Sequence, residues 1–286
     1  MWKLFLQLHF AVLLAGFTGV FGRLISYDAF TLVFFRFLFA TVIVFMYVSY
    51  TRKLVAFNFR QKLRICFVGS LLAIHLILFY LSIKLSNVSI GTITIAATCF
   101  FTTALEPLII KTPFKKQNLL YGFIIVLGLL LIFNFDTKFR FGIAIGFVSA
   151  LFSSLFSIYN KKFTHSLDAY TCISYEMLGG FILTLLVMPM VLLCENNYSF
   201  EFNNLDMFYL FALASVFTVY LYLLVIKLSS KLSAFTINLT FNLEPIYAIF
   251  YAMLIFNESS ELHSSFYAGM ALVILSVVLQ NRKEKV

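Results

Sequence analysis

Two glutamates in strongly apolar stretches are the residues of this chain most able to do chemistry. Each is followed by a proline, because the tripeptide Leu-Glu-Pro occurs twice. A carboxylate is unfavourable in lipid, and a proline leaves the carbonyl four residues earlier without its usual helical hydrogen bond. The pattern predicts that Glu106 and Glu244 line a polar path and that Pro107 and Pro245 kink their helices. The alternative is that each glutamate is paired inside the protein and holds two halves of the chain in register.

Other polar side chains in apolar stretches extend this candidate path. Thr102 and Thr240 lie one helical turn before the two glutamates, on the same face. Arg36 lies well inside an apolar stretch, where it would either bind a substrate carboxylate or pair with an acid or with carbonyl groups. The remaining candidates are His9, His75, Glu176, Asn238, Asn242 and Tyr247. Their spacing fits no metal-binding or catalytic motif, so we expect no metal site, catalytic residue or cofactor.

Composition decides the class of protein. The chain of 286 residues is 62% hydrophobic and 12% charged, whereas soluble domains carry about a quarter charged residues. Apolar runs separated by charged or turn residues predict an all-α polytopic membrane protein with ten transmembrane helices. The spans are expected near 4–22, 30–50, 63–83, 89–110, 119–134, 141–160, 170–194, 206–227, 232–256 and 265–281.

The distribution of Lys and Arg predicts how the spans are oriented. With a cytoplasmic N-terminus, 16 of the 21 Lys and Arg lie in cytoplasmic segments and only Arg23, Lys84, Lys138 and Arg140 lie outside. This bias satisfies the positive-inside rule and places both termini in the cytoplasm. The net charge of +9 is then a consequence of topology, so we expect no nucleic-acid partner.

The chain divides into two similar halves. Ile-Lys-Leu-Ser precedes the first Leu-Glu-Pro at residues 83–86 and the second at residues 226–229. We predict one five-helix repeat over 1–137 and a second over 138–286. Because five is an odd number of spans, the second half must have inverted topology in the membrane.

These residues resemble the EamA-type transporters of the drug/metabolite transporter superfamily. The similarity lies in Arg36-Phe37, in the two Glu-Pro pairs of spans four and nine, in the run from Leu243 to Glu258, and in span six with Lys161-Lys162. The resemblance implies ten spans as two inverted repeats around a central path. It also implies a secondary transporter that exports a small organic metabolite, such as an amino acid or a related compound, across a bacterial inner membrane. A monomer would suffice, and a dimer is possible.

Two other classes of membrane protein fit the sequence less well than a transporter does. A membrane-embedded enzyme or assembly protein would need clustered His and acidic residues, or a catalytic pair, and no such cluster stands out. An ion channel would need a filter loop or several chains around one pore. No phosphate-binding Gly-x-x-x-x-Gly-Lys motif is present, so the sequence predicts no ATP hydrolysis by this chain.

Overall fold

The protein, seen here as a computed structural model, has helices as its regular secondary structure in the residues that the structure describes. These are all residues except 1, 112–115, 136, 165–166, 195–201, 230, 233–236, 238–239, 242 and 284–286. The helices are α1 (Trp2–Leu24), α2 (Ala29–Tyr50), α3 (Phe59–Leu85), α4 (Val88–Thr94), α5 (Thr98–Ile110), α6 (Lys116–Phe135), α7 (Arg140–Thr164), α8 (Ala169–Cys194), α9 (Asn204–Ala214), α10 (Leu221–Ser229), α12 (Glu244–Phe256) and α13 (Ser264–Lys283). The connecting short helices are η1 (Ile95–Ala97), η2 (Thr137–Phe139), η4 (Glu258–Ser260) and the π-helix η3 (Ser215–Tyr220).

The predicted all-α membrane class is confirmed. Within the described residues, seven helices or joined helices are long and apolar enough to cross a membrane, and three shorter apolar helices accompany them. Large apolar side chains such as Met46, Leu186 and Leu193 are exposed on the outside of the bundle, where lipid would cover them. That all ten segments cross the membrane stays a prediction.

Short polar residues begin several of these helices. Asp28 Oδ1 accepts hydrogen bonds from the backbone N–H groups of Phe30 and Thr31 at the start of α2. Asn58 and Gln61 form a capping box at the start of α3. Each cap satisfies donors that the first helical turn leaves without a partner, so the helix starts follow from local sequence.

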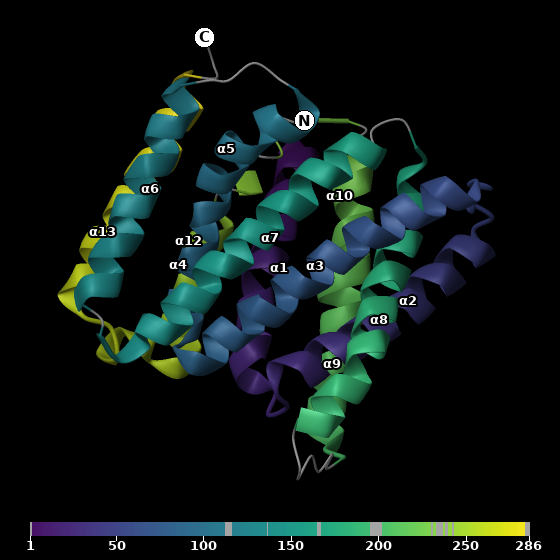
Figure 1. The fold of residues 1–286 in the computed structure, drawn as a ribbon, viewed down its shortest axis with the longest axis horizontal. Helices are drawn as coiled ribbons and strands as arrows, with labels where there is room; N and C mark the ends of the chain where they lie inside the picture. Colours follow the sequence, from purple (N-terminus) through teal and green to yellow (C-terminus); the bar gives the residue numbers. More distant parts are fainter. Residues whose placement is uncertain are drawn as a thin grey trace.

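Glycines and small residues allow the long helices to approach closely. In Figure 1, α3 and α7 run side by side through the middle of the molecule, and α6 pairs with α13 at one edge. A Cβ at Gly146 of α7 would lie 2.1 Å from Thr94 Oγ1, and a Cβ at Gly69 of α3 would lie 1.9 Å from the carbonyl oxygen of Glu176 in α8. Only glycine permits such contacts at these two positions, so both glycines serve close packing of the helices.

The two Leu-Glu-Pro tripeptides do not occupy equivalent places in their spans. The structure interrupts span four at η1, ten residues before Pro107, and α5 continues through that proline to Ile110. Pro245 instead lies in the first turn of α12, a position where its missing N–H is not needed. The structure thus shows a break before α5 and a helix start at Pro245, and a kink at Pro107 stays a prediction.

The structural match between the halves lies in α5 and α12 themselves. Each has 13 residues, and each ends at a residue in the left-handed region, Lys111 with φ 63° and Asn257 with φ 54°. This match pairs Thr98 with Glu244, 146 positions apart (98 to 244), whereas the tripeptides are 138 positions apart (106 to 244). The two helices and the two tripeptides therefore suggest different registers for the halves, and the register of the repeats stays a prediction.

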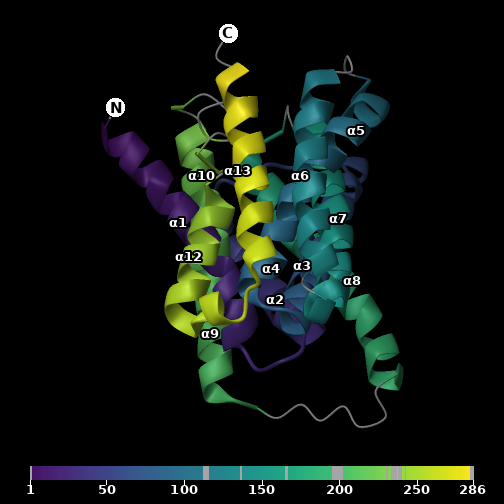
Figure 2. The ribbon, with the colours of Figure 1, turned by 90° about the vertical axis from the view of Figure 1, so that its left-hand side faces the viewer.

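Both ends of the described chain lie at one end of the bundle. Helix α1 begins and α13 ends toward the upper edge of the molecule, and α12 meets η4 near the lower edge (Figure 2). The chain therefore crosses the bundle an even number of times between the start of α1 and the end of α13. Which end faces the cytoplasm stays a prediction.

Candidate functional site

A cavity of about 810 Å³ lies among helices from both halves of the chain. Most of its wall is apolar, with Phe79, Phe156, Phe217 and Met177 among the larger side chains. Its polar and charged lining consists of His9, Thr18, Arg36, His75, Thr92, Thr98, Ser153, Thr218, Tyr222, Thr240 and Glu244. A mainly apolar cavity with a few converging polar groups is the usual form of a small-molecule site.

Arg36 is the principal cationic group of the cavity. Its residue is 6% exposed, and the guanidinium donates to Thr218 Oγ1 (3.0 Å) and to the Tyr80 hydroxyl (2.7 Å). Thr218 stands in the π-helix η3, where its own hydroxyl donates to the carbonyl of Leu213 five residues earlier (2.8 Å). Among the described residues, Arg36 therefore binds these two hydroxyls and not the acid or carbonyl group expected from the sequence. Three of the five N–H groups of Arg36 form no hydrogen bond within the described residues and can bind another partner.

Glu244 supplies the anionic group of the cavity. It begins α12 and is partly buried, and its carboxylate has no hydrogen bond or ion pair within the described part of the chain. Arg36 is near enough to act on it electrostatically without forming an ion pair. Thr240, one turn earlier, is 8% exposed and lines the same wall. The cavity thus holds one cation and one anion that are not bonded to each other.

Two histidines also reach the cavity. His75 Nδ1 lies 3.1 Å from the carbonyl oxygen of Ser149 and 2.9 Å from its hydroxyl, which itself donates to the His75 carbonyl (2.8 Å). Because a carbonyl only accepts, Nδ1 is the donor of this hydrogen bond, and Nε2 is left for another contact. His9 is exposed and lines the cavity near the beginning of α1.

Glu106 and Thr102 are not among the residues that line the cavity. Glu106 Oε1 accepts a hydrogen bond from Lys161 Nζ at 2.7 Å, in an ion pair near the end of α5. Thr102 Oγ1 donates to Ser154 Oγ (3.1 Å) between α5 and α7. Here the structure supports the alternative considered above, a glutamate paired within the protein, although a part for Glu106 in the path stays a prediction.

Glu176 and Tyr247 also lie outside the cavity lining. Glu176 is 2% exposed and accepts a hydrogen bond from Asn160 Nδ2 (3.1 Å), where α8 packs on its neighbours. Tyr247 packs against α1, because a Cβ placed on Gly16 would lie 3.0 Å from the Tyr247 Cβ. Asn238 and Asn242 fall outside the described residues. Of the sequence candidates, Arg36, Glu244, Thr240, His75 and His9 therefore share the cavity.

Among the residues of this site that sequence reasoning missed are three hydroxyl groups with a clear role. Tyr80 and Thr218 bind Arg36, but neither stands in a motif, and only the need of a buried arginine for acceptors pointed to such residues. Thr92 is 5% exposed and lines the cavity, and its hydroxyl has no hydrogen-bond partner among the described residues. The signal that could have identified Thr92 is its hydroxyl side chain within the apolar run of span four.

These features define a class: a multi-pass helical membrane protein with a polar-lined cavity between its helices. The chain belongs to the EamA-like transporter family, whose model matches residues 2–134 and again residues 140–282. This is a family of membrane transporters, which implies a small-molecule substrate and a lipid bilayer as the protein's surroundings.

Comparison with solved structures supports the fold. One of them, titled "Crystal structure of protein", is 10% identical and has a TM-score of 0.63, with 96% of this chain and 95% of that chain covered. No curated protein matches the sequence. Within the described residues, no group of three His, Cys, Asp or Glu side chains is placed to hold a metal ion.

Proposed function

We propose that the protein is a secondary transporter that exports a small zwitterionic metabolite, of the amino-acid class, across a bacterial cytoplasmic membrane. The observation that carries this proposal is the cavity lined by Arg36 and Glu244, two charged residues that form no ion pair within the described residues. An EamA-like transporter needs such a site for its substrate. Transport would proceed by alternating access, in which one half moves against the other around a fixed site.

Two inverted repeats, 1–137 and 138–286, are part of this proposal, and the helix contacts support them. The pairing of the 13-residue helices makes α1 the counterpart of α7, and α5 the counterpart of α12. If each helix is replaced by its counterpart in the other half, the contact between α1 and α12 becomes the contact between α7 and α5. In the same way, the contact between α3 and α7 becomes the contact between α10 and α1, and both members of each pair occur. The family match over 2–134 and 140–282 supports a boundary between the repeats near residue 137.

The charges favour a dipolar substrate. An ammonium group would bind the Glu244 carboxylate, and a carboxylate would bind the remaining N–H groups of Arg36, which suit the two oxygens of that group. The hydroxyl of Thr92 offers a further hydrogen bond within the same wall. The phenylalanine-rich remainder of the cavity would hold an apolar side chain.

The experiment that tests this function compares metabolites inside and outside cells that express the protein or its Glu244→Gln variant, in a host that lacks similar exporters. We expect one class of small zwitterions to fall inside the cells and rise in the medium with the native protein only. Accumulation inside the cells would reverse the proposed direction. No change across a broad panel, with the protein confirmed in the membrane, would contradict transport and favour a membrane-embedded enzyme or assembly protein.

A further inference from the structure

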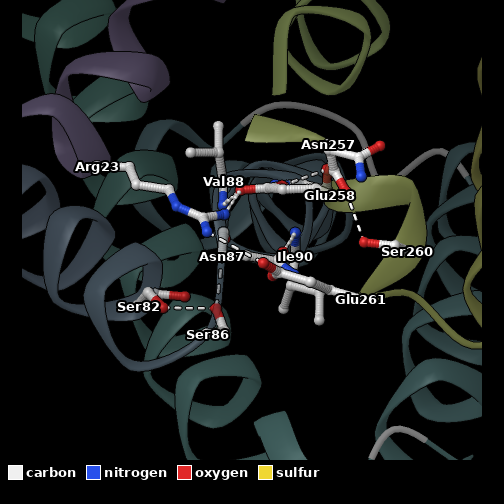
Figure 3. A network of polar contacts seen from close by, with 11 residues as sticks. Arg23, Ser82, Ser86, Asn87, Val88, Ile90, Asn257, Glu258, Ser260 and Glu261 are labelled. Atoms are coloured by element: carbon white, nitrogen blue, oxygen red, sulfur yellow. Dashed lines mark hydrogen bonds and ion pairs between the residues drawn. The ribbon is translucent and has the colours of Figure 1, made fainter. Parts of the chain in front are cut away.

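A fully buried carboxylate joins the two halves of the chain at one end of the bundle. Glu258, which follows α12, is 0% exposed. Its Oε1 accepts hydrogen bonds from Arg23 Nη1 (2.8 Å) and Val88 N (2.9 Å), and its Oε2 accepts from Ser89 N (2.8 Å) and Ser89 Oγ (2.7 Å). Figure 3 shows Arg23 and Glu258 facing each other across the start of α4. All four acceptor positions of the carboxylate are therefore filled.

A second carboxylate extends this contact. Glu261 Oε1 accepts from Arg23 Nη2 (3.0 Å), and Glu261 Oε2 accepts from Asn87 Nδ2 (3.3 Å). The guanidinium of Arg23 also lies 4.9 Å from the centre of the Phe256 ring. Five residues, Arg23, Asn87, Ser89, Glu258 and Glu261, thus form what we call the Arg23 network. Its basic and amide members come from the first half of the chain, and its acids come from the second.

The Arg23 network lies beside the cavity, toward one end of the bundle. Thr18 lines the cavity, and Arg23 follows it by five residues, about 7.5 Å along α1. Thr92 lines the cavity as well, and Ser89 precedes it by about 4.5 Å along α4. In the other direction along α1, the cavity extends to the exposed His9. The network therefore lies between the cavity and the end of the bundle opposite to the start of α1.

Neighbouring contacts add to the closure at this end. Ser26 donates its backbone N–H and its hydroxyl to Asp206, which links the first half to α9. Lys84 Nζ, by contrast, donates to the carbonyl of Ile25 (2.9 Å), a hydrogen bond within the first half that does not join the two halves. The elements that surround the cavity on this side are thus held together by charged and polar groups rather than by apolar packing alone.

We infer that the Arg23 network is a gate that closes the cavity at this end, and that the two halves separate there when the gate opens. This inference rests on the proposed function, because only a transporter by alternating access needs such an opening. A carboxylate and a guanidinium that leave each other at the edge of a membrane regain hydrogen bonds from water, so opening replaces bonds rather than abolishing them. An apolar seam would lose its packing to water instead. In the orientation proposed above, this gate faces the outside of the cell.

The test measures access to Cys99, which lines the cavity, from the gated side. The other cysteines, Cys66, Cys172 and Cys194, are replaced by Ser, and whole cells are treated with a membrane-impermeant maleimide. We expect Arg23→Gln and Glu258→Gln to raise the rate of Cys99 labelling about tenfold, since loss of one charge-assisted hydrogen bond shifts a two-state equilibrium by about that factor. Lys84→Gln is the matched control, because it removes a charge at the same end but no hydrogen bond between the halves, and its labelling should equal that of the parent.

Each outcome decides the inference. Unchanged labelling in folded Arg23→Gln and Glu258→Gln protein, or an equal rise in Lys84→Gln, would mean that the network only holds the fold together and would overturn the gate. If Glu258→Gln does not fold, Glu261→Gln removes one partly exposed partner of Arg23 and is subject to the same criterion with a smaller expected rise. Labelling needs no transported solute, so it can succeed where the metabolite comparison fails and thereby separates the gate from the proposed function.

Discussion

The two Leu-Glu-Pro glutamates offer a matched pair for testing the site, because the same substitution in the same tripeptide should have unequal effects. Glu244→Gln removes the negative charge that we expect to bind a substrate ammonium group. This side chain is partly buried and lines the cavity. A hydrogen bond to a charged group contributes about 1.5–3 kcal/mol. The substitution should therefore raise the substrate KM about 10- to 150-fold, since each 1.4 kcal/mol is a factor of ten.

Glu106→Gln should leave transport nearly unchanged. The side chains of Lys161 and Glu106 are 59% and 25% exposed, and a pair of this kind contributes about 0–1 kcal/mol. We expect its KM to stay within about twofold of the native value and its melting temperature to fall only slightly. Both variants keep the size of the native side chain, so neither should alter insertion into the membrane.

The assay is counterflow of a labelled substrate in proteoliposomes, with the amount of inserted protein measured for each variant. Equal KM values for Glu244→Gln and the native protein would refute the assignment of Glu244 to the substrate. A loss in Glu106→Gln as large as that in Glu244→Gln would show that the path includes both glutamates, as the sequence alone predicted.

Three further predictions concern other parts of the structure. Arg36→Lys keeps the charge but not the planar fork of donors, so we expect a KM about tenfold higher in the same counterflow assay, with little change in the melting temperature. Gly69→Ala would bring a Cβ to 1.9 Å from the carbonyl oxygen of Glu176, so it should destabilise the protein by about 1–3 kcal/mol in thermal unfolding in detergent. Burial raises the pKa of Glu261, but hydrogen bonds from Arg23 and Asn87 outweigh it and hold that pKa below its usual range. The stabilisation by Glu261 should therefore be present at neutral pH and be lost as pH falls below about 4, so that the unfolding curves of native protein and Glu261→Gln converge only in acid.

The helical class and the places of the helices could be predicted because lipid leaves a chain few choices. Apolar runs of about 20 residues must form helices in lipid, and polar caps such as Asp28 mark where they begin. The same reasoning found Arg36 and His75, since a polar group inside such a run must have a reason to be there. Both residues line the cavity.

The partners of these polar groups could not be predicted, because they depend on which helices meet. Nothing in the run around Lys161 indicates that α7 packs on α5 and brings this lysine to Glu106. Likewise, Thr218 reaches Arg36 from a π-helix, a local conformation for which its apolar surroundings give no signal. Two glutamates in the same tripeptide therefore look alike in the sequence and differ in the structure.

The proposed pairing of the two halves gives a reason why only one of these glutamates should bind substrate. If the 13-residue helices α5 and α12 are counterparts, as proposed above, the counterpart of Glu244 is Thr98 rather than Glu106. Both counterparts line the cavity, but one carries a charge and the other carries a hydroxyl that donates to the carbonyl of Ala150 (3.4 Å). A fold with related halves can thus present an asymmetric site. If Glu244 binds the ammonium group of a substrate, the first half has no equivalent carboxylate at that level, and Arg36 then fixes a single orientation for the bound molecule.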